Sequence, residues 1–192
     1  MIYFETIKCK NKKIFHIKYH QKRIMKTVGL DISLFNYIDP PSIELLKCKV
    51  IYNKNGIINI EFLPYKQKKI TSFNLITNNN IIYSTKSLNR DLIDSLYRKK
   101  GIAHEIIIIK NNLITDTSIA NIAIYYDNIW ITPTIPLLKG TTRARFIDEK
   151  KIIQRDITPF ELIKSKKIAL MNSMINFSVI NDFKIINKKY NI

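Results

Sequence analysis

Cysteine, glycine and long apolar runs are all scarce in this sequence of 192 residues. Cys9 and Cys48 are the only thiols, which excludes a disulfide-rich fold and favours a reducing cytoplasm. The four glycines leave no Walker loop and no dinucleotide-binding fingerprint. Apolar runs such as residues 106–109 are far shorter than the roughly 20 residues that span a bilayer. Because the N-terminal segment carries Glu5 and lacks an apolar core, we expect no signal peptide and no membrane partner.

Acidic residues are few as well, since 15 of them stand against 32 Lys and Arg, for a net charge of +17. A strongly basic protein attracts nucleic acid through its phosphates. Lys supplies 26 of the basic residues, however, and Arg, the usual reader of bases and phosphates, only 6. The charges are spread along the chain, and Ile and Asn are abundant together with Lys, which is typical of a genome-wide base-composition bias. We therefore expect no nucleic-acid partner.

The histidines and cysteines do not form a metal motif. His16 and His20 are four residues apart, but no Glu follows His16 as in metalloproteases, and a strand-to-helix junction is expected there. Cys9, Cys48 and His104 lack zinc-ligand spacing. We expect no metal site.

Residues 1–80 are predicted to form a small N-terminal α/β lobe. A strand over residues 2–8 precedes a helix over residues 20–28, which Gly29 ends. Asn55-Gly56 predicts a hairpin between two strands, and a further strand is expected over residues 70–76. Asn78-Asn79-Asn80 is the expected linker.

Residues 81–192 are predicted to form a larger C-terminal lobe, so that the fold class is mixed α+β. Thr158, Pro159 and Glu161 form a capping box with Pro at the first helical position, which predicts a helix there. A stripe of Leu88, Leu92 and Leu96 predicts a helix over residues 88–100. The remaining expected elements are strands over residues 81–83, 105–110, 113–115, 121–125, 129–132, 168–171 and 178–186, and a helix over residues 142–150.

Residues 113–145 carry an ordered series of landmarks. An acidic residue is followed by Asn and an aliphatic residue, then by a hairpin that ends in Thr-Pro, an aliphatic pair, and Gly with Thr and Arg. These parts are Asp116, Asn121-Ile122, Thr132-Pro133, Leu137-Leu138 and Gly140-Thr141-Thr142-Arg143. The series resembles the signature of the class IV, or fold-type IV, pyridoxal-phosphate aminotransferases.

Upstream segments extend the resemblance over nearly the whole chain. Residues 86–90, Lys-Ser-Leu-Asn-Arg, resemble the family's catalytic-lysine segment, and residues 4–7 and 20–24 resemble N-terminal landmarks. Within the family, the lysine segment and Met171-Asn172-Ser173-Met174 most resemble the aminodeoxychorismate lyases. The resemblance implies a two-lobed enzyme with pyridoxal 5′-phosphate between its lobes, a small-molecule substrate and a homodimer.

The resemblance also implies roles for single residues. Lys86 would be the Schiff-base lysine and general acid/base, carried by the larger lobe. Asp116 would face the ring nitrogen, although the family usually carries Glu there. Arg23 would bind the phosphate, which a guanidinium suits, with the helix start at Gly140, Thr141 and Thr142. Asn172 and Ser173 would complete the phosphate site and Asn121 would support Asp116. Tyr83 and Arg143 are candidates for substrate contact, and Asn89 and Arg90 are expected to serve the scaffold.

Three functions stay open at this point. A 4-amino-4-deoxychorismate lyase would release pyruvate and 4-aminobenzoate for folate biosynthesis. An aminotransferase acting on branched-chain or D-amino acids would use the same cofactor residues. A Lys-rich binding protein on a degenerate fold would hold no cofactor and would bind nucleic acid with a steep dependence on salt.

Overall fold

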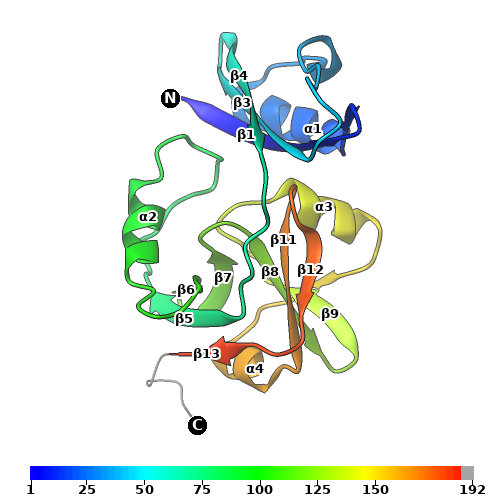
Figure 1. Cartoon of the computed structure of the whole chain (residues 1–192). Helices are drawn as coiled ribbons and strands as arrows, with labels where there is room; N and C mark the ends of the chain where they lie inside the picture. The colour runs from blue at the N-terminus through cyan, green and yellow to red at the C-terminus, as the bar shows by residue number, and fades with distance from the viewer. Residues whose placement is uncertain (187–192) are drawn as a thin grey trace. The chain divides into compact units, whose positions relative to one another are not determined.

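A computed structural model describes residues 1–186, which fall into two compact units (Figure 1). The first comprises Met1–Lys68 and Thr85–Asn89, and the second comprises Lys69–Ser84 and the described residues from Arg90 onward. The chain therefore divides after Lys68, not at residue 80, and residues 85–89 return to the first unit. Lys86, expected in the larger lobe, belongs to that returning segment.

The first unit is an antiparallel sheet with one long helix. Its sheet has the order β2-β1-β3-β4. The elements are β1 (Tyr3–Lys10), β2 (Lys13–Ile14), α1 (Ile17–Val28), the short helix η1 (Leu34–Asn36), β3 (Leu46–Asn53) and β4 (Gly56–Pro64). Asn55 and Gly56 lie at the β3–β4 turn, as the sequence predicts.

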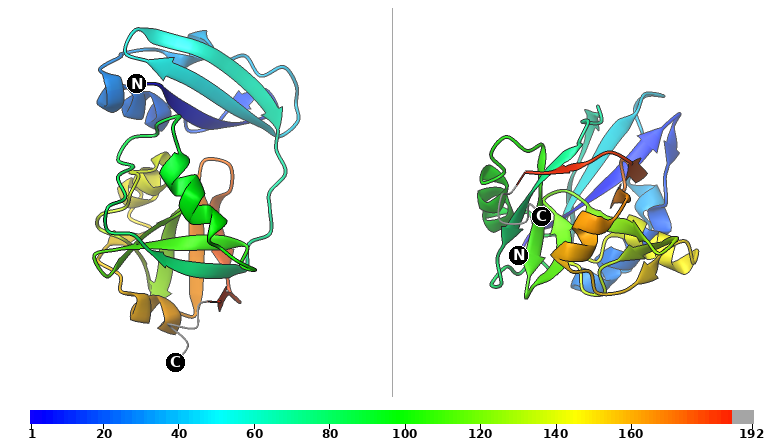
Figure 2. Two further views of the ribbon diagram at one scale, coloured as in Figure 1. Left: turned by 90° about the vertical axis from the view of Figure 1, so that its left-hand side faces the viewer. Right: turned by 90° about the horizontal axis from the view of Figure 1, so that it is seen from below.

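Alternation along β1 and β3 creates the buried face of this sheet. Every second residue of β3 is buried, and Ile7 of β1 is fully buried beside them. Ile17 and Ile24 of α1 pack into the same apolar cluster. The left panel of Figure 2 shows α1 against this sheet. Glu5 shares this side of β1, so an acidic group lies beneath the helix.

Residues 85–89 join the first unit through backbone contacts with the start of β1. The amide N–H of Phe4 donates to the carbonyl oxygen of Lys86 at 3.0 Å, and that of Leu88 donates to Ile2 at 2.9 Å. Tyr3 and Ser87 form an antiparallel bridge between these contacts. These contacts hold the segment beside the start of β1 and fix the backbone of Lys86.

The second unit is built on a branched, mixed sheet. Among the described residues its strands run in the order β10-β9-β8-β7-β6-β5-β13, with β11 paired to both β8 and β12. The strands are β5 (Ser72–Thr77), β6 (Glu105–Lys110), β7 (Leu113–Thr117), β8 (Asn121–Tyr126), β9 (Ile129–Thr132), β10 (Ile153–Gln154), β11 (Lys167–Asn172), β12 (Asn176–Ile180) and β13 (Lys184–Ile185). The helices are α2 (Asp91–Arg98), α3 (Thr141–Asp148) and α4 (Pro159–Lys164).

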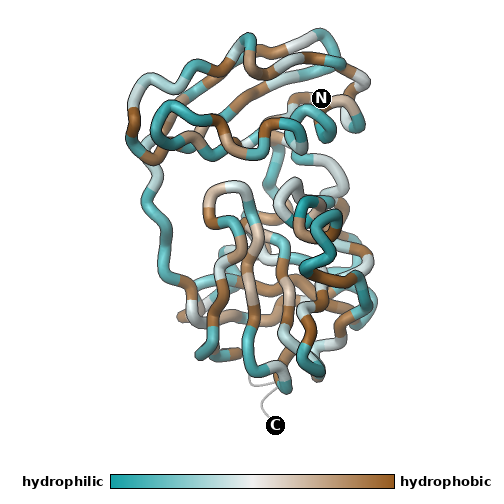
Figure 3. Tube along the Cα trace, turned by 90° about the vertical axis from the view of Figure 1, so that its right-hand side faces the viewer, coloured by the Kyte–Doolittle hydropathy of each residue, from teal (hydrophilic) through white to brown (hydrophobic). Residues whose placement is uncertain are grey.

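Strand β6 is buried on both faces, which explains its unbroken run of Ile. Ile106 and Ile108 pack with Ile93 and Leu96 of α2. Ile107 belongs to the larger core of the unit on the opposite face. Figure 2 shows α2 across the strands, and Figure 3 shows the hydrophobic stretches along them.

Several predicted elements differ in detail from those observed. The helix of residues 88–100 covers only Asp91–Arg98, and it buries Ile93 and Leu96 while Leu88 and Leu92 stay exposed. Residues 81–83 are not a strand, and the Ile81 carbonyl oxygen accepts a hydrogen bond from the Lys110 ammonium group. The strand expected over residues 178–186 is divided between β12 and β13.

Candidate active site

Asp116 lies near the end of β7, where that strand pairs with β8 through a single register pair, Asp116 and Asn121. Its carboxylate is buried, and each oxygen accepts a hydrogen bond. Asn121 Nδ2 donates to Oδ1 at 2.7 Å, and the Leu138 amide donates to Oδ2 at 2.8 Å. Burial raises the pKa of Asp116 to about 7, against the opposing effects of the Leu138 amide, Asn121 and the Arg143 charge. A cation beside this carboxylate would be strongly stabilised.

Asn121 joins Asp116 to the loop that precedes α3. Its amide nitrogen also donates to the Leu138 carbonyl oxygen at 2.8 Å. The backbone of Gly140 lies so close to the Asn121 side chain that a β-carbon on residue 140 would be 2.0 Å from Asn121 Oδ1. Gly140 has an ordinary extended backbone, with φ −67° and ψ 146°, so contact with Asn121, and not backbone conformation, demands glycine.

Helix α3 begins at Thr141, and its N-cap residue, Gly140, offers no side-chain cap. Its first residues, Thr141 and Thr142, are buried. The first amides of a helix lack intrahelical acceptors, and the helix dipole favours an anion beside them. A helix start of this kind suits an anion, and the binding of phosphate by Gly140, Thr141 and Thr142 stays a prediction.

Arg143 is buried in the first turn of α3 and contacts protein groups. Its guanidinium donates to the Pro133 carbonyl oxygen at 2.7 Å, to Gln154 Oε1 at 3.0 Å and to Thr132 Oγ1 at 3.3 Å. These contacts join α3 to the end of β9 and to β10. Arg143 thus serves the scaffold of the site, and its expected contact with substrate stays a prediction.

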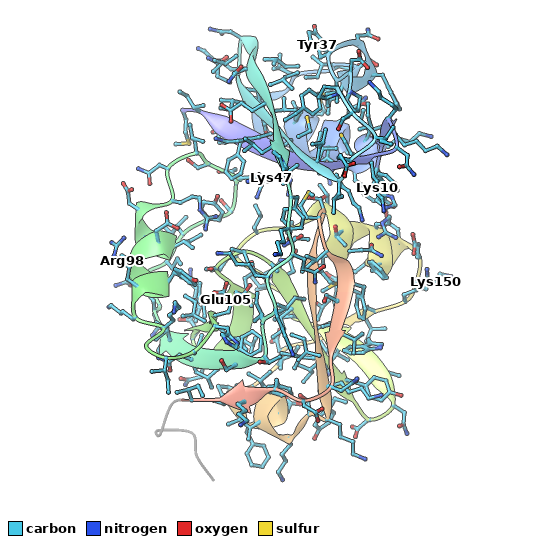
Figure 4. All side chains as sticks on the ribbon, in the orientation of Figure 1. Lys10, Tyr37, Lys47, Arg98, Glu105 and Lys150 are labelled. Carbon is cyan, nitrogen blue, oxygen red and sulfur yellow. The ribbon has the colours of Figure 1, made fainter. Side chains whose placement is uncertain are left out.

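The turn between Asp116 and Asn121 is held from several sides. The Ser118 amide donates to Glu105 Oε1 at 3.4 Å, and the Ser118 carbonyl accepts from Arg90 at 2.9 Å. Glu105 begins β6 and is buried, which raises its pKa. Figure 4 labels it inside the second unit, whereas Arg98 and Lys150 extend outward. The sequence reasoning missed Glu105, although an acid at the head of an Ile-only strand was a usable signal.

Asn172 contacts the same turn from the end of β11. Its Nδ2 donates to the Ile119 carbonyl oxygen at 3.2 Å, and its Oδ1 accepts from the Met174 and Ile175 amides at 2.9 and 3.1 Å. Ser173 beside it is half-buried. The second unit therefore brings Asp116, Asn121, Gly140 and Asn172 into one connected group, in which Asn172 acts through the turn.

A second buried polar group lies in the first unit. The carboxylate of Glu5 accepts hydrogen bonds from Arg23 on both of its oxygens, through Arg23 Nε at 2.7 Å and through Nη2. His20 Nδ1 lies 2.6 Å from Glu5 Oε2. Burial acts to raise the pKa of Glu5, but the Arg23 charge and these hydrogen bonds outweigh it and lower the pKa to about 2. Glu5 is therefore an anion throughout the physiological range.

Lys86 is half-buried in the same unit. Its Nζ lies 4.4 Å from the centre of the Phe4 ring, and its charge helps to lower the pKa of His20, on which burial has the largest effect. Tyr83 belongs to the second unit, where the Arg90 guanidinium lies 5.9 Å from its ring centre. Arg23 and Lys86 thus belong to the first unit, and all the other predicted site residues belong to the second.

Comparison with known proteins identifies the class. The family model for amino-transferase class IV matches residues 57–182. An uncharacterised protein of Haemophilus influenzae is 33% identical over 182 residues, which cover 89% of this chain and 96% of that protein. The chain therefore belongs to the class IV aminotransferase family, and it is an enzyme of this kind.

Solved structures share the fold. A Haemophilus somnus protein provisionally named 4-amino-4-deoxychorismate lyase is 31% identical, with a TM-score of 0.78 over 95% of this chain and 97% of that one. A hypothetical aminotransferase of Mycobacterium tuberculosis, solved with bound pyridoxal phosphate, has a TM-score of 0.75 at 15% identity, over 95% of this chain and 81% of that one. The family depends on pyridoxal phosphate. In residues 1–186 no helix has the length and apolar character needed to cross a membrane.

Proposed function

We propose that this protein is a pyridoxal-phosphate-dependent 4-amino-4-deoxychorismate lyase, which releases pyruvate and 4-aminobenzoate for folate biosynthesis. The observation that carries the cofactor assignment is the buried Asp116 carboxylate, held by Asn121 and the Leu138 amide. The name of the Haemophilus somnus structure supports the choice of lyase within the family.

The donor set of each unit fits one part of the cofactor. In the second unit, a buried carboxylate whose pKa is raised by desolvation suits a protonated ring nitrogen, and the uncapped start of α3 suits a phosphate. In the first unit, Arg23 offers a guanidinium of fixed orientation to a phosphate, and Lys86 offers an amine. When bound, the cofactor supplies an electron sink for negative charge that develops on the substrate.

Each residue then has a defined task. Lys86 removes the proton from the substrate carbon that bears the amine. The bond from the neighbouring ring carbon to the enolpyruvyl oxygen breaks, which leaves an aromatic amine, and the released enolpyruvate gains a proton to become pyruvate. The atoms balance without water or an oxidant. Asp116 would keep the ring nitrogen of the bound cofactor protonated, because a positive charge there stabilises the buried Asp116 carboxylate.

The first test uses the visible spectrum of purified protein with added pyridoxal phosphate, beside Lys86→Ala. We expect an absorbance band from the lysine-bound cofactor in the wild type and none in the variant. Borohydride reduction followed by peptide mass analysis should then find the added cofactor mass on Lys86. A folded wild type that shows neither result contradicts the assignment, and it would favour the Lys-rich binding protein.

The second test distinguishes the lyase from an aminotransferase acting on branched-chain or D-amino acids. Release of pyruvate and 4-aminobenzoate from aminodeoxychorismate is the expected result. Conversion of the bound cofactor to its amine form by amino acids, with aminodeoxychorismate left intact, would instead establish the aminotransferase.

The assembly and location are also part of the proposal. A homodimer is what the family resemblance implies, and the free, buried Cys9 and Cys48 favour a reducing cytoplasm. Sedimentation of the purified protein tests the dimer, and cell fractionation tests the location.

A further inference from the structure

Glu5 lies beneath α1 and contacts two residues on one face of that helix. His20 and Arg23 are three positions apart, so their side chains project from the same face toward β1. The Glu5 side chain is 0% exposed and Arg23 only 13% exposed. The carboxylate is therefore reached by its two partners and not by solvent.

The contact fixes the plane of the Arg23 guanidinium. Two parallel N–H donors of Arg23 meet the two oxygens of Glu5, and such fork-to-fork pairing has a narrow geometry. His20 Nδ1 lies within hydrogen-bonding distance of Oε2 of the same carboxylate, so Glu5 is itself held against rotation. Glu5 also shares its strand with Phe4, whose backbone amide donates to Lys86.

Stability alone does not account for an ion pair at this position. Burying two charges removes them from water, and apolar residues of similar volume often stabilise a core at least as well. The surrounding cluster is apolar, with Ile7, Ile24 and Val50 fully buried in it. The ion pair inside this cluster is better explained by a function of the partly exposed Arg23 guanidinium.

We propose that Glu5, steadied by His20, is the positioning residue for Arg23 and holds its guanidinium in the orientation that receives the cofactor phosphate. This role rests on the proposed function, in which Arg23 binds that phosphate. Glu5 acts through Arg23, because a carboxylate placed directly against a phosphate would repel it.

The test compares pyridoxal phosphate with pyridoxal, which lacks the phosphate, by titrating the visible band of the purified protein. The variants are Glu5→Gln, Arg23→Gln and the double variant. Glu149→Gln, which removes the carboxylate partner of Arg145, is the matched control. In Glu5→Gln we expect on the order of tenfold weaker binding of pyridoxal phosphate and unchanged binding of pyridoxal. In the Arg23→Gln background, Glu5→Gln should have no further effect.

The double variant keeps the experiment informative if Glu5→Gln leaves Arg23 as an uncompensated buried charge and does not fold. It contains no such charge, and it is compared directly with Arg23→Gln. The positioning role is overturned if Glu5→Gln weakens the binding of pyridoxal phosphate and of pyridoxal equally. It is also overturned if Glu5→Gln weakens pyridoxal-phosphate binding further in the Arg23→Gln background. A wild type that binds neither aldehyde overturns the proposed function itself, and the role of Glu5 with it.

Discussion

The side-chain oxygen of Asn121 occupies the space that a β-carbon on Gly140 would need, since the two positions are 2.0 Å apart. The same Asn121 donates to Asp116 and to the Leu138 carbonyl. Because residue 140 has no side chain, the Asn121 amide can occupy the position from which it supports the buried Asp116 carboxylate.

Gly140→Ala should displace Asn121 and break its bond to Asp116. We expect a loss of about 1–3 kcal/mol in the free energy of unfolding, measured by urea denaturation, because the new methyl overlaps a buried polar atom. The affinity for pyridoxal phosphate should fall as well.

The matched background is Asn121→Ala, in which the obstructing oxygen is gone. There the same Gly140→Ala change should have less than half of its effect, since the two residues share one contact. Equal effects in both backgrounds would show that Gly140 is required for another reason.

Asp116 should make the cofactor-free enzyme less stable as the pH rises from about 4 to 7. An unfolded Asp titrates near 3.9, and burial raises the pKa of Asp116 to about 7 in the folded protein. Between these values the folded state holds a proton that the unfolded state has lost. The wild type should therefore lose roughly 4 kcal/mol relative to Asp116→Asn across this window, measured by denaturation at each pH. If the unfolding free energies of the two proteins change in parallel with pH, the raised pKa of Asp116 is contradicted.

Glu5 should have the opposite effect on stability, which it should increase as the pH rises from about 2 to 4.3. Its pKa is lowered to about 2 in the folded protein, whereas an unfolded Glu titrates near 4.3. Its contribution is complete above pH 4.3 and disappears as the pH falls toward 2. The difference in unfolding free energy between wild type and Glu5→Gln should shrink by roughly 3 kcal/mol over that range. A difference independent of pH would mean that Glu5 is not held as an anion.

Glu105 should stabilise the turn that follows Asp116. Glu105→Ala removes the acceptor of the Ile106 and Ser118 amides, so we expect a loss of about 1–3 kcal/mol in unfolding free energy. Glu61→Ala is the control, because Glu61 is also on a strand but 39% exposed, and it should change stability by less than about 0.5 kcal/mol. Similar losses in the two variants would argue against a specific role for Glu105.

Local patterns predicted the parts of the site that depend on neighbours in sequence. The order of Asp116, Asn121 and Gly140 indicated a carboxylate, its support and a helix start, and all three lie together in the second unit. The capping box at Thr158 is also present, because it needs only residues within one helical turn.

Contacts between distant residues escaped the sequence reasoning. Glu5 and His20 are fifteen positions apart on different elements, and only the packing of α1 on β1 brings them together. Residues 85–89 carry no strand alternation and join β1 through backbone bonds, which any side chains allow. The contact of Glu105 with the Ser118 amide depends on the pairing of β6 with β7, which local periodicity does not reveal.

The two cysteines and the single tryptophan give each unit its own reporter. Cys9 and Cys48 are buried in the first unit, so a thiol reagent modifies them only when that unit opens. Trp130 is in the second unit, with ring centres 5.2 Å from Tyr125 and 4.9 Å from Phe177, so its fluorescence follows the packing there. Thiol-labelling rates and tryptophan fluorescence, both recorded on the unmutated chain, will show whether the enzyme unfolds as one cooperative body or in two steps.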